Sequence, residues 1–292
     1  MRILVTGGTG FLGSAFVRSA QAAGHTIAVL SRQLVPMANG ILRLNGSVAE
    51  PPWMEIERFA PEACLHAAWI ATPGVYLDSP ENQNWVAWSD ALLVRLAQMG
   101  VNHLTVLGTC IEYGITGRPL AETATALNPV SPYARAKCEL HRRLQSGVLP
   151  TSTSLAWARI FYPYGEGEHP ARLASSLVAK LRRGEPVALK TPRSTKDYIH
   201  ADDVASALLA VVGQRFAGAI NVGTGEGVTV EAIAREIGQL VGRPDLITVP
   251  ENPPNDPLDF VVADATRLRS LGWRPQVRLA VGLRRLVEAR AT

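Results

Sequence analysis

The sequence predicts an α/β fold in which a doubly wound parallel sheet carries helices on both faces. Short apolar runs alternate with segments of helical periodicity, and the first run is followed at once by glycines and a helical pattern, as in a βαβ unit. Alternation of this kind implies parallel strands, because a helix crosses over between one strand and the next. The length of 292 residues leaves room for about two structural units.

The first half of the chain supplies most of the predicted sheet. The expected strands are 2–6, 26–30, 41–44, 63–66, 103–107 and 154–160. The helical patterns between them include 11–23, 84–98 and 133–144. Gly24 ends the first helix, because the left-handed position that closes a helix favours glycine.

The rhythm changes after residue 160. A loop at 163–170, a helix to about residue 183, a short strand at 186–189 and a loop through 195 come first. Segments 197–199, 201–212 and 219–222 then indicate a return to the main sheet, and helices at 229–241, 265–271 and 279–289 accompany a proline-rich stretch at 250–257. The prediction is a larger dinucleotide-binding unit, 1–160 with 196–223, and a smaller discontinuous substrate-binding unit, 161–195 with 224–292.

Composition excludes several classes of protein. Hydrophobic residues make up 47% of the chain and charged residues 18%, which is typical of a globular protein rather than a disordered or fibrous one. The net charge of +4 is a small excess without a basic patch, so no nucleic-acid partner is expected. The apolar runs fall short of the roughly 20 residues that a membrane-spanning helix needs, so no membrane partner is expected.

The cysteines carry no signal for a metal or a disulfide. Cys64, Cys110 and Cys138 are an odd number without C-x-x-C spacing, so we expect no metal site. The chain passes within residues 1–6 straight into the first predicted strand, so no signal peptide is expected. A reduced, cytoplasmic enzyme is the resulting expectation.

A glycine-rich segment, TGGTGFLG at 6–13, follows the first strand and opens the first helix. It contains the pattern G-x-G-x-x-G, in which glycine allows a tight turn, close approach of the backbone to a pyrophosphate, and close packing of helix on strand. The amide groups at the start of the helix then point at the phosphates. The predicted cofactor contacts here are Gly7, Gly10, Phe11, Leu12 and Gly13.

The end of the second strand indicates which dinucleotide binds. An NAD site usually offers a carboxylate to the adenosine ribose about 20 residues past the glycines. None occurs at 30–33, where Ser31 and Arg32 stand instead. A hydroxyl and a guanidinium suit a 2′-phosphate, which arginine binds through paired, charge-assisted hydrogen bonds. We therefore expect NADP, with NAD possible; the alternative is that Arg32 is a solvated loop residue.

The segment SPYARAK at 131–137 predicts an acid–base group. Ser131 caps a helix and Pro132 fits its first turn, so Tyr133 and Lys137, four residues apart, share one face. A phenol with a pKa near 10 exchanges protons poorly at neutral pH, whereas a nearby ammonium lowers the pKa of the phenol. We expect Lys137 to act on Tyr133 in this way.

Several motifs recur in a fixed order along nearly the whole chain. They are TGGTGFLG, HAA at 66–68, GTCIEYG at 108–114, SPYARAK, ARIFYPYG at 158–165, KDYIHADDV at 196–204, NVGTGEGVTV at 221–230 and LGW at 271–273. In this the sequence resembles the extended short-chain dehydrogenase/reductases of the NAD-dependent epimerase/dehydratase family. The resemblance implies a Rossmann fold and an enzyme that uses NAD(P).

The resemblance also implies roles for individual residues. Thr109 takes the catalytic Ser/Thr position, with its hydroxyl on the reacting oxygen, and Lys137 additionally holds the nicotinamide ribose. Ala67 and Ala68 pass close to the cofactor, and Asn84 supports the active site. A homodimer formed through the helices that bear Tyr133 and Asn84 is expected by analogy.

Other residues receive a structural interpretation. His200, Asp202 and Asp203 match a family motif that we interpret mainly as structural, with an aspartate capping the helix near Val204. His169 is expected to be a solvated loop residue; the alternative is an acid–base group in an epimerising variant. The remaining notable side chains, Cys110, Trp85 and Trp88, are expected to have no catalytic role, the two tryptophans packing or forming a subunit contact.

The resemblance leaves the reaction open between reduction and epimerisation. Dehydratases of the family carry Asp-Glu directly after the catalytic threonine, and Cys110-Ile111 stands there in this chain, so dehydration is not expected. A reductase draws on the NADP pool, which Ser31 and Arg32 favour. A redox-neutral epimerase with tightly bound NAD(P) is the alternative.

The expected substrate is a nucleotide-linked 4-keto-6-deoxy sugar, because the C-terminal insertions resemble the nucleotide-sugar branch of the family. Tyr162 stands where that branch often has asparagine, and Arg172 is a candidate contact for the diphosphate, so the expected substrate residues are Thr109, Tyr133, Tyr162 and Arg172. A non-catalytic NADP-binding sensor or scaffold is a second alternative, although such proteins typically lose the tyrosine or the lysine.

Overall fold

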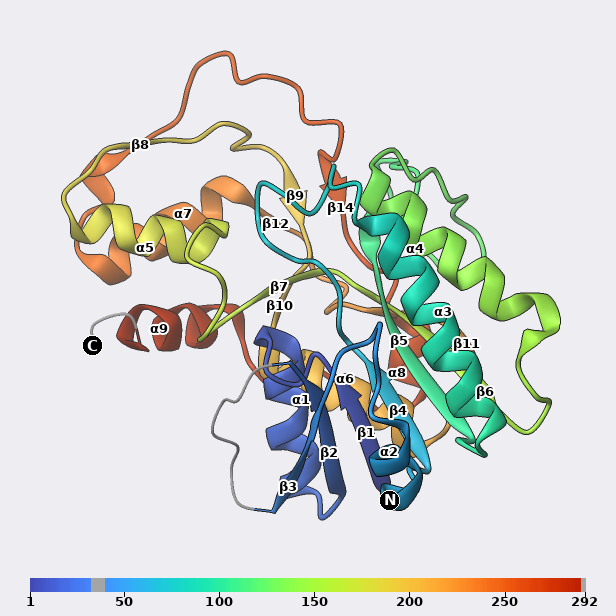
Figure 1. Ribbon diagram of the computed structural model, residues 1–292. Coiled ribbons are helices and arrows are strands. Elements are labelled where there is room, and N and C mark those ends of the chain that lie inside the picture. Colours follow the sequence, from blue (N-terminus) through green and yellow to red (C-terminus); the bar gives the residue numbers. More distant parts are fainter. Residues whose placement is uncertain (33–39, 290–292) are drawn as a thin grey trace.

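The computed structural model describes residues 1–32 and 40–289. Seven parallel strands form the central sheet in the order β11-β6-β5-β4-β1-β2-β3 (Figure 1). Their bounds are β1 (Arg2–Thr6), β2 (Thr26–Ser31), β3 (Ile41–Asn45), β4 (Ala63–His66), β5 (His103–Thr109), β6 (Ser154–Ile160) and β11 (Gly218–Val222). The strand order reverses between β1 and β4, which is the point where a doubly wound sheet opens a crevice for ligands. The predicted Rossmann fold is confirmed.

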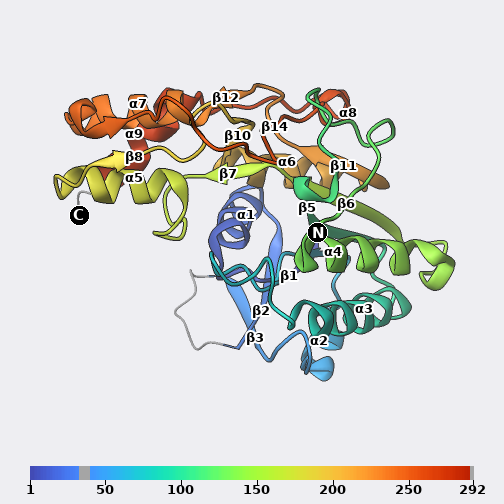
Figure 2. The same cartoon turned by 90° about the horizontal axis from the view of Figure 1, so that it is seen from above.

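Helices cover both faces of this sheet (Figure 2). One face carries α1 (Phe11–Ala22) and α6 (Ala201–Gly213), and the other carries α2 (Trp53–Phe59), α3 (Asn82–Gln98) and α4 (Pro132–Arg143). Alternate residues of β1 serve the two layers: Ile3 and Val5 pack with α1 and α6, while Leu4 packs under α3. Because side chains alternate along a strand, a run of apolar residues such as β1 fills both layers at once.

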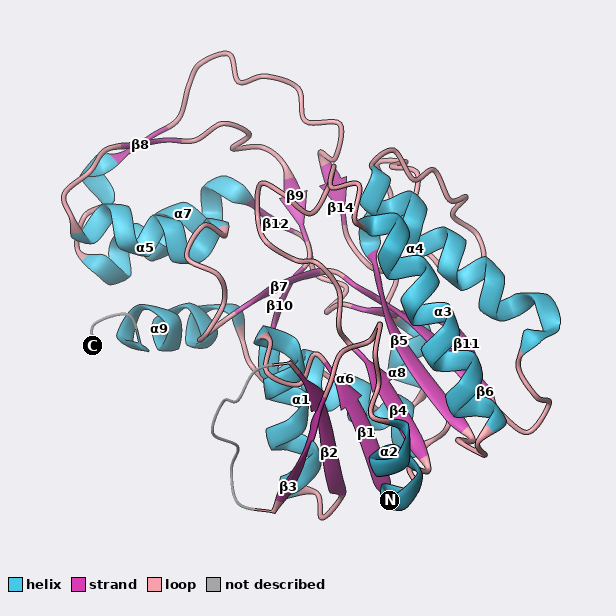
Figure 3. Ribbon diagram, in the orientation of Figure 1, coloured by secondary structure: helices cyan, strands magenta, loops and turns pink. Residues whose placement is uncertain are grey.

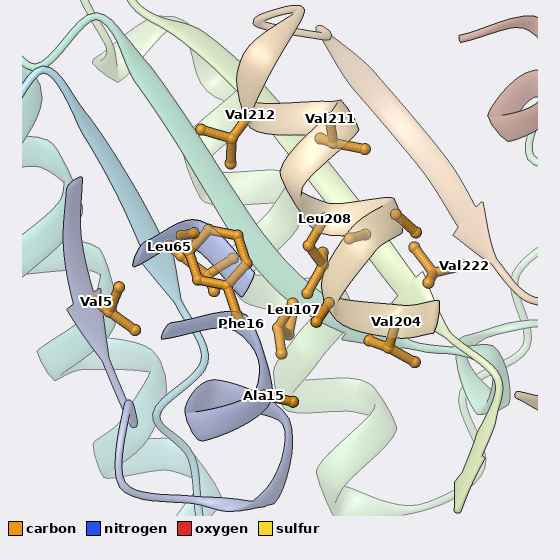
Figure 4. Packing of buried hydrophobic residues seen from close by; sticks show 14 of the residues in the cluster. Val5, Ala15, Phe16, Leu65, Leu107, Val204, Leu208, Val211, Val212 and Val222 are labelled. Carbon is orange, nitrogen blue, oxygen red and sulfur yellow. The ribbon is translucent and has the colours of Figure 1, made fainter. Parts of the chain in front are cut away.

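The layer of α1 and α6 contains one of the largest fully buried side chains, Phe16. Val5 and Leu65 of the sheet and Leu208 of α6 belong to the same cluster (Figure 4). The short helix α8 (Thr266–Ser270) extends this layer beside β11, and Trp273 packs into it from the following turn.

A smaller unit lies beyond the carboxyl ends of the strands (Figure 3). Its helices are α5 (Leu173–Arg182), α7 (Val230–Val241) and α9 (Leu279–Ala289), which share a separate hydrophobic core. Two sets of short paired strands lie between this unit and the sheet: β7 (Tyr162–Tyr164) with β10 (Tyr198–His200), and β9 (Thr195–Lys196) with β12 (Val228–Thr229) and β14 (Phe260–Val261). A third pair, β8 (Val187–Ala188) with β13 (Ile247–Thr248), packs within the core of the smaller unit. Single turns at η1 (Cys110–Glu112), η2 (Leu144–Val148) and η3 (Pro244–Leu246) complete the described elements.

Ion pairs connect the last helix, α9, to the start of α6 and to the loop after β7. Arg285 of α9 donates to Glu166 and to Asp202, each at 2.7 Å, and Glu166 also contacts His200 at 2.9 Å. His200 is the N-cap of α6, its ring accepting from the backbone N–H of Asp202. Asp203 accepts from the backbone of residues 276 and 277. These contacts support the structural interpretation of the motif, although the cap is His200 rather than an aspartate.

Two expectations about the second half are wrong. Residues 197–199 do not join the main sheet: within the described parts of the chain β10 pairs with β7 alone, because the chain turns into α6 directly after His200. The loop expected at 163–170 begins later, since β7 extends to Tyr164. The helix α2 was not expected from the sequence, because it has only seven residues.

None of the helices in the described parts of the chain combines the length and the hydropathy needed to cross a membrane.

We expect Phe16→Ala to lower the free energy of unfolding by about 3 to 5 kcal/mol, because the side chain is 0% exposed and its loss leaves a cavity between α1 and the sheet. Urea unfolding followed by circular dichroism measures the change. Met54→Ala is the control, because Met54 is 76% exposed and its truncation should change stability by less than about 0.5 kcal/mol. Equal losses in the two variants would contradict this view of the core.

Candidate active site

The glycine-rich loop lies directly against the segment that follows β4. Gly7 has a φ of +69°, and a Cβ there would come within 2.7 Å of the backbone nitrogen of Ala68. A Cβ on Gly13 would overlap the carbonyl oxygen of Gly7. The same oxygen accepts from the N–H of Gly10, the N-cap of α1, at 3.0 Å. Glycine at positions 7 and 13 therefore allows the loop to pack closely against the neighbouring backbone. The start of α1 faces the cavity, where a ligand can reach it.

A buried hydrogen-bond chain holds the segment after β4 in place. Thr6 Oγ1 contacts His66 Nδ1 at 2.9 Å and accepts from the backbone N–H of Ala68 at 3.2 Å. His66 Nε2 contacts Ser89 Oγ of α3 at 2.9 Å. Burial lowers the pKa of His66 to about 3, so its ring is neutral and serves as a link between β1, β4 and α3.

Two cavities adjoin at the carboxyl ends of the strands, and the larger has a volume of about 700 Å³. Every cofactor residue predicted from the glycine-rich loop, from the end of β2 and from the end of β4 lines it: Gly7, Gly10, Phe11, Leu12, Gly13, Ser31, Arg32, Ala67 and Ala68. The volume lies within the range of cofactor pockets. Residues 46–48 after β3 also line it; the sequence reasoning missed them, although their place after a parallel strand was a usable signal.

The smaller cavity, about 260 Å³, adjoins the larger one, and Leu107, Pro163 and Arg172 line both. The predicted residues Thr109, Tyr133, Lys137, Tyr162 and Arg172 all lie on its wall. The structure thus brings together residues from β5, α4, β7 and the start of α5. Among the described residues that line this cavity, none is a carboxylate.

The start of α4 sets the direction of Tyr133 and Lys137. Ser131 Oγ accepts from the N–H of Ala134 at 3.1 Å, and Pro132 takes the first helical position. The N–H of Tyr133 donates to the carbonyl of Leu77 at 3.0 Å, which joins the helix to the loop after β4. A helix that begins at Pro132 presents residues 133 and 137 on one face, toward the cavity.

Burial controls the charge of Lys137. Its side chain is 2% exposed, and Nζ donates to the carbonyl of Leu107 at 2.7 Å. Burial lowers the pKa of Lys137 to about 7, although the Glu112 carboxylate acts in the opposite direction. The ammonium is therefore costly at this position and depends on the groups around it.

The expected lowering of the pKa of Tyr133 by Lys137 is wrong for the protein alone. Burial raises the pKa of the Tyr133 phenol well above its usual value, and Tyr76, Glu112 and Cys110 raise it further. Only Arg172 acts in the lowering direction among the main contributions. The phenol is consequently neutral near pH 7 and holds a proton that it can donate.

The backbone of Thr109 is anchored by a buried carboxylate. Glu112 is 0% exposed and accepts from the N–H of Thr109 at 2.8 Å. Trp157 Nε1 donates to the same carboxylate at 3.0 Å, and Arg159 Nε donates at 2.7 Å. Three donors compensate for the loss of water around this charge.

The network continues from Arg159 to the last strand of the sheet. Arg159 donates to Tyr113 Oη at 2.8 Å, and Tyr113 in turn donates to Asn221 Oδ1 at 2.8 Å. The N–H of Asn221 donates to Glu122 at 2.8 Å. The motifs at 108–114, 158–165 and 221–230 therefore meet in one buried polar chain behind Thr109.

Cys110 and Ile111 occupy the places of the acid pair that dehydratases carry, and both line the smaller cavity. Burial raises the pKa of the Cys110 thiol to about 12, so the thiol is not ionised near pH 7.

Two aromatic residues of the site were missed by sequence reasoning. Trp69, next to the HAA motif, lines both cavities, and Tyr76 lines the smaller one. The Tyr76 ring lies edge-on to Tyr133 with centroids 4.9 Å apart. Their loop follows a strand at the switch point of the sheet, which was the available signal.

Asn84, expected to support the active site, is exposed and is absent from the described residues that line the two cavities. Asn82, two residues earlier, is 1% exposed and accepts from Trp69 Nε1 at 2.8 Å. Trp85 and Trp88 stack edge to face at 5.6 Å and line the larger cavity. His169 lines the larger cavity too, with an exposed side chain.

Comparison with known proteins identifies the family to which the chain belongs. Residues 3–223 match the model of the NAD dependent epimerase/dehydratase family. A UDP-glucose 4-epimerase of Mycolicibacterium smegmatis is 30% identical, over 99% of this chain and 98% of the relative. The chain therefore belongs to the NAD dependent epimerase/dehydratase family, the extended short-chain dehydrogenase/reductases that the sequence resembles.

Solved structures agree at the level of the whole chain. The UDP-glucose 4-epimerase of Thermus thermophilus in complex with NAD superposes with a TM-score of 0.85 and 27% identity, over 99% of this chain and 98% of that one. MoeE5 in complex with UDP-glucuronic acid and NAD superposes with a TM-score of 0.83 and 25% identity, over 100% and 99%.

We expect Gly13→Ala to weaken dinucleotide binding at least 10-fold, because the added methyl group displaces Gly7 from its place against Ala68. Fluorescence titration with NADPH and NADH measures the dissociation constants. Gly213→Ala is the matched control: it lies at the end of α6 with open space around its Cβ position. Unchanged binding in Gly13→Ala would contradict the proposed contact between the loop and the cofactor.

Proposed function

We propose that the protein is an NADP-dependent oxidoreductase that reduces a keto group of a nucleotide-linked 4-keto-6-deoxy sugar, with Tyr133 as the general acid. Membership of the family supports hydride chemistry on nucleotide sugars. The observation that carries the proposal is the smaller cavity, where Thr109, Tyr133 and Lys137 adjoin the cofactor cavity without a carboxylate. Such a wall suits simple hydride transfer better than the elimination of water, which needs a separate acid and base.

The choice of NADP rests on the end of β2. Ser31 and Arg32 line the larger cavity, and the carboxylate among its lining residues, Glu81, belongs to the start of α3 instead. Ser31 is buried while Arg32 is exposed at the rim, which leaves the guanidinium free to turn toward a 2′-phosphate. Gln33, the next residue, lies outside the described part of the chain.

Each polar residue of the smaller cavity has its own role in the proposed reaction. The bound cofactor supplies the hydride. Tyr133, held neutral by burial, donates its proton to the alkoxide oxygen that develops, and the Thr109 hydroxyl orients that oxygen by a hydrogen bond. Lys137, as an ammonium, stabilises the phenolate that Tyr133 becomes. Most of the walls are apolar or aromatic, which would strengthen these interactions wherever the bound ligands displace water.

The same walls favour a 6-deoxy sugar. Leu12, Ile111, Ile160, Phe161 and Leu258 line the smaller cavity, and a methyl group at the sugar C5 is better matched to them than a hydroxymethyl or carboxylate group. Tyr162 and Arg172 are the proposed contacts for the rest of the substrate, and Arg172 is suited to a diphosphate.

A redox-neutral 4-epimerase is the second candidate. The similarity to UDP-glucose 4-epimerases along the whole chain favours it. An epimerase returns its hydride and consumes no cofactor, whereas a reductase oxidises one NADPH for each sugar reduced. Assays of NADPH oxidation on a panel of UDP- and dTDP-linked 4-keto-6-deoxyhexoses, beside UDP-glucose, therefore decide between the two. Binding of NADPH without turnover of any sugar would indicate the sensor or scaffold alternative.

We expect Tyr133→Phe to lower the rate of NADPH-dependent sugar reduction by about 10²- to 10⁴-fold, because the general acid is lost while the ring remains. Stopped-flow measurement of NADPH oxidation gives the rate, and a binding titration confirms that the cofactor still binds. Tyr198→Phe, in a tyrosine of β10 that lines neither cavity, should keep the wild-type rate. A near wild-type rate in Tyr133→Phe would remove Tyr133 from the mechanism.

We expect Arg32→Asp to reverse the cofactor preference. Loss of charged hydrogen bonds to a 2′-phosphate should weaken NADPH binding roughly 10- to 100-fold, while the new carboxylate suits the free ribose of NADH. The ratio of kcat/KM for the two cofactors measures the change. Arg43→Asp makes the same change of charge on β3, away from both cavities, and should leave the ratio as it is. A preference that Arg32→Asp does not alter contradicts the assignment of NADP.

A further inference from the structure

The ammonium position of Lys137 lies over the ring of Trp69. Nζ is 3.8 Å from the centroid of the indole, closer than the 5.9 Å that separates it from the Tyr133 ring. The indole also meets Tyr133 edge-on, with centroids 6.5 Å apart. Trp69 therefore contacts both members of the Tyr-Lys pair and lines both cavities, the boundary where cofactor and substrate meet.

The indole ring is itself held in place. Trp69 Nε1 donates to Asn82 Oδ1 at 2.8 Å. The amide nitrogen of Asn82 donates to the carbonyls of Tyr76 and Ser79 at 2.7 and 2.9 Å. Both the oxygen and the nitrogen of the side-chain amide are therefore hydrogen-bonded. The orientation of the ring is therefore fixed by the start of α3 and by the loop that leads to it.

The ammonium form of Lys137 depends on groups that stabilise its charge, because the side chain is buried. Burial favours the neutral amine. Among the described residues around Lys137, the carbonyl of Leu107 accepts from Nζ at 2.7 Å and Glu112 from η1 favours the ammonium, whereas His66 from β4 is neutral and Tyr133 lies on the same helix as Lys137. The face of an indole attracts a cation through its quadrupole, most strongly where water is excluded. At 3.8 Å the ring is within the distance at which this attraction is significant.

We propose that Trp69 is a positioning residue whose ring keeps the Lys137 side chain in place as an ammonium, and that Asn82 fixes the ring for this purpose. The inference deepens the proposed function, since it rests on the role assigned to Lys137 there. Trp69 donates nothing to the reaction; it determines how much of Lys137 is charged at a given pH.

The chain makes a direct measurement of Lys137 practical, because it contains four lysines, Lys137, Lys180, Lys190 and Lys196. Labelling lysine with ¹³C at Cε gives one resolvable signal for each, and the Lys137→Met variant identifies the signal of Lys137. Titration of the intact protein then yields the midpoint of each lysine independently of any catalytic assay.

We expect Trp69→Leu to move the titration midpoint of Lys137 down by roughly 0.5 to 1.5 pH units, because the attraction that favours the ammonium is lost. Trp69→Phe keeps an aromatic face, so the midpoint of Lys137 should stay closer to the wild-type value than in Trp69→Leu. Trp88→Leu is the matched control from the same aromatic cluster, and the midpoint of Lys137 should not move there. In turnover assays, the fall in kcat/KM at high pH should move to lower pH in Trp69→Leu.

The opposite sign overturns the proposal. If Trp69 merely shields Lys137, its loss admits water and the midpoint rises toward the usual value for lysine. An unchanged titration midpoint of Lys137 in Trp69→Leu would also contradict the proposal. If Trp69→Leu does not fold, as signals of the other three lysines would reveal, Trp69→Met makes the same test with a longer apolar side chain. Full activity in Lys137→Met, by contrast, would contradict the proposed function and leave the titration to decide the role of Trp69.

Discussion

The buried ion pair between Glu112 and Arg159 is the interaction on which the site most depends. Both side chains are almost completely removed from solvent, at 0% and 3% exposed. Such a pair is stable only when hydrogen bonds satisfy its remaining atoms, and loss of one partner typically costs about 3 to 5 kcal/mol. Here those hydrogen bonds lead to Thr109 on one side and, through Tyr113, to Asn221 on the other. The geometry of the site is thus tied to the strand order of the sheet.

The same carboxylate shapes the electrostatics of the two titrating groups. Glu112 favours the ammonium of Lys137 and opposes the phenolate of Tyr133. Burial has the larger effect on both and favours their neutral forms. The protein's own residues therefore keep the Tyr133 phenol protonated, which is the form that the proposed reduction requires of its general acid. For the reverse direction the phenolate would depend on the Lys137 ammonium and on charge that arrives with the ligands.

The sequence predicted the sheet well because each strand of the larger unit is an apolar run bounded by polar turns. Such runs can be recognised from neighbouring residues alone, without knowledge of tertiary contacts. It also predicted Gly7, Tyr133 and Lys137 as site residues from the chemistry that their residue types would perform, and the structure places them on the walls of the two cavities. It missed Trp69 and Asn82, and it chose Asn84 in place of Asn82, because burial depends on how α3 rotates against the loop before it. The pairing of β10 with β7 was missed for a similar reason, since three-residue strands carry no periodic signal.

The position of β11 in the chain also bears on how the protein is made. This strand completes the sheet beside β6, yet it is synthesised only after residues 161–217, most of which build other layers. During synthesis β6 therefore remains an unpaired edge, which is the kind of surface that invites association between nascent chains. Because Asn221 lies in β11 and closes the polar chain behind Thr109, the site is assembled only when that edge is covered.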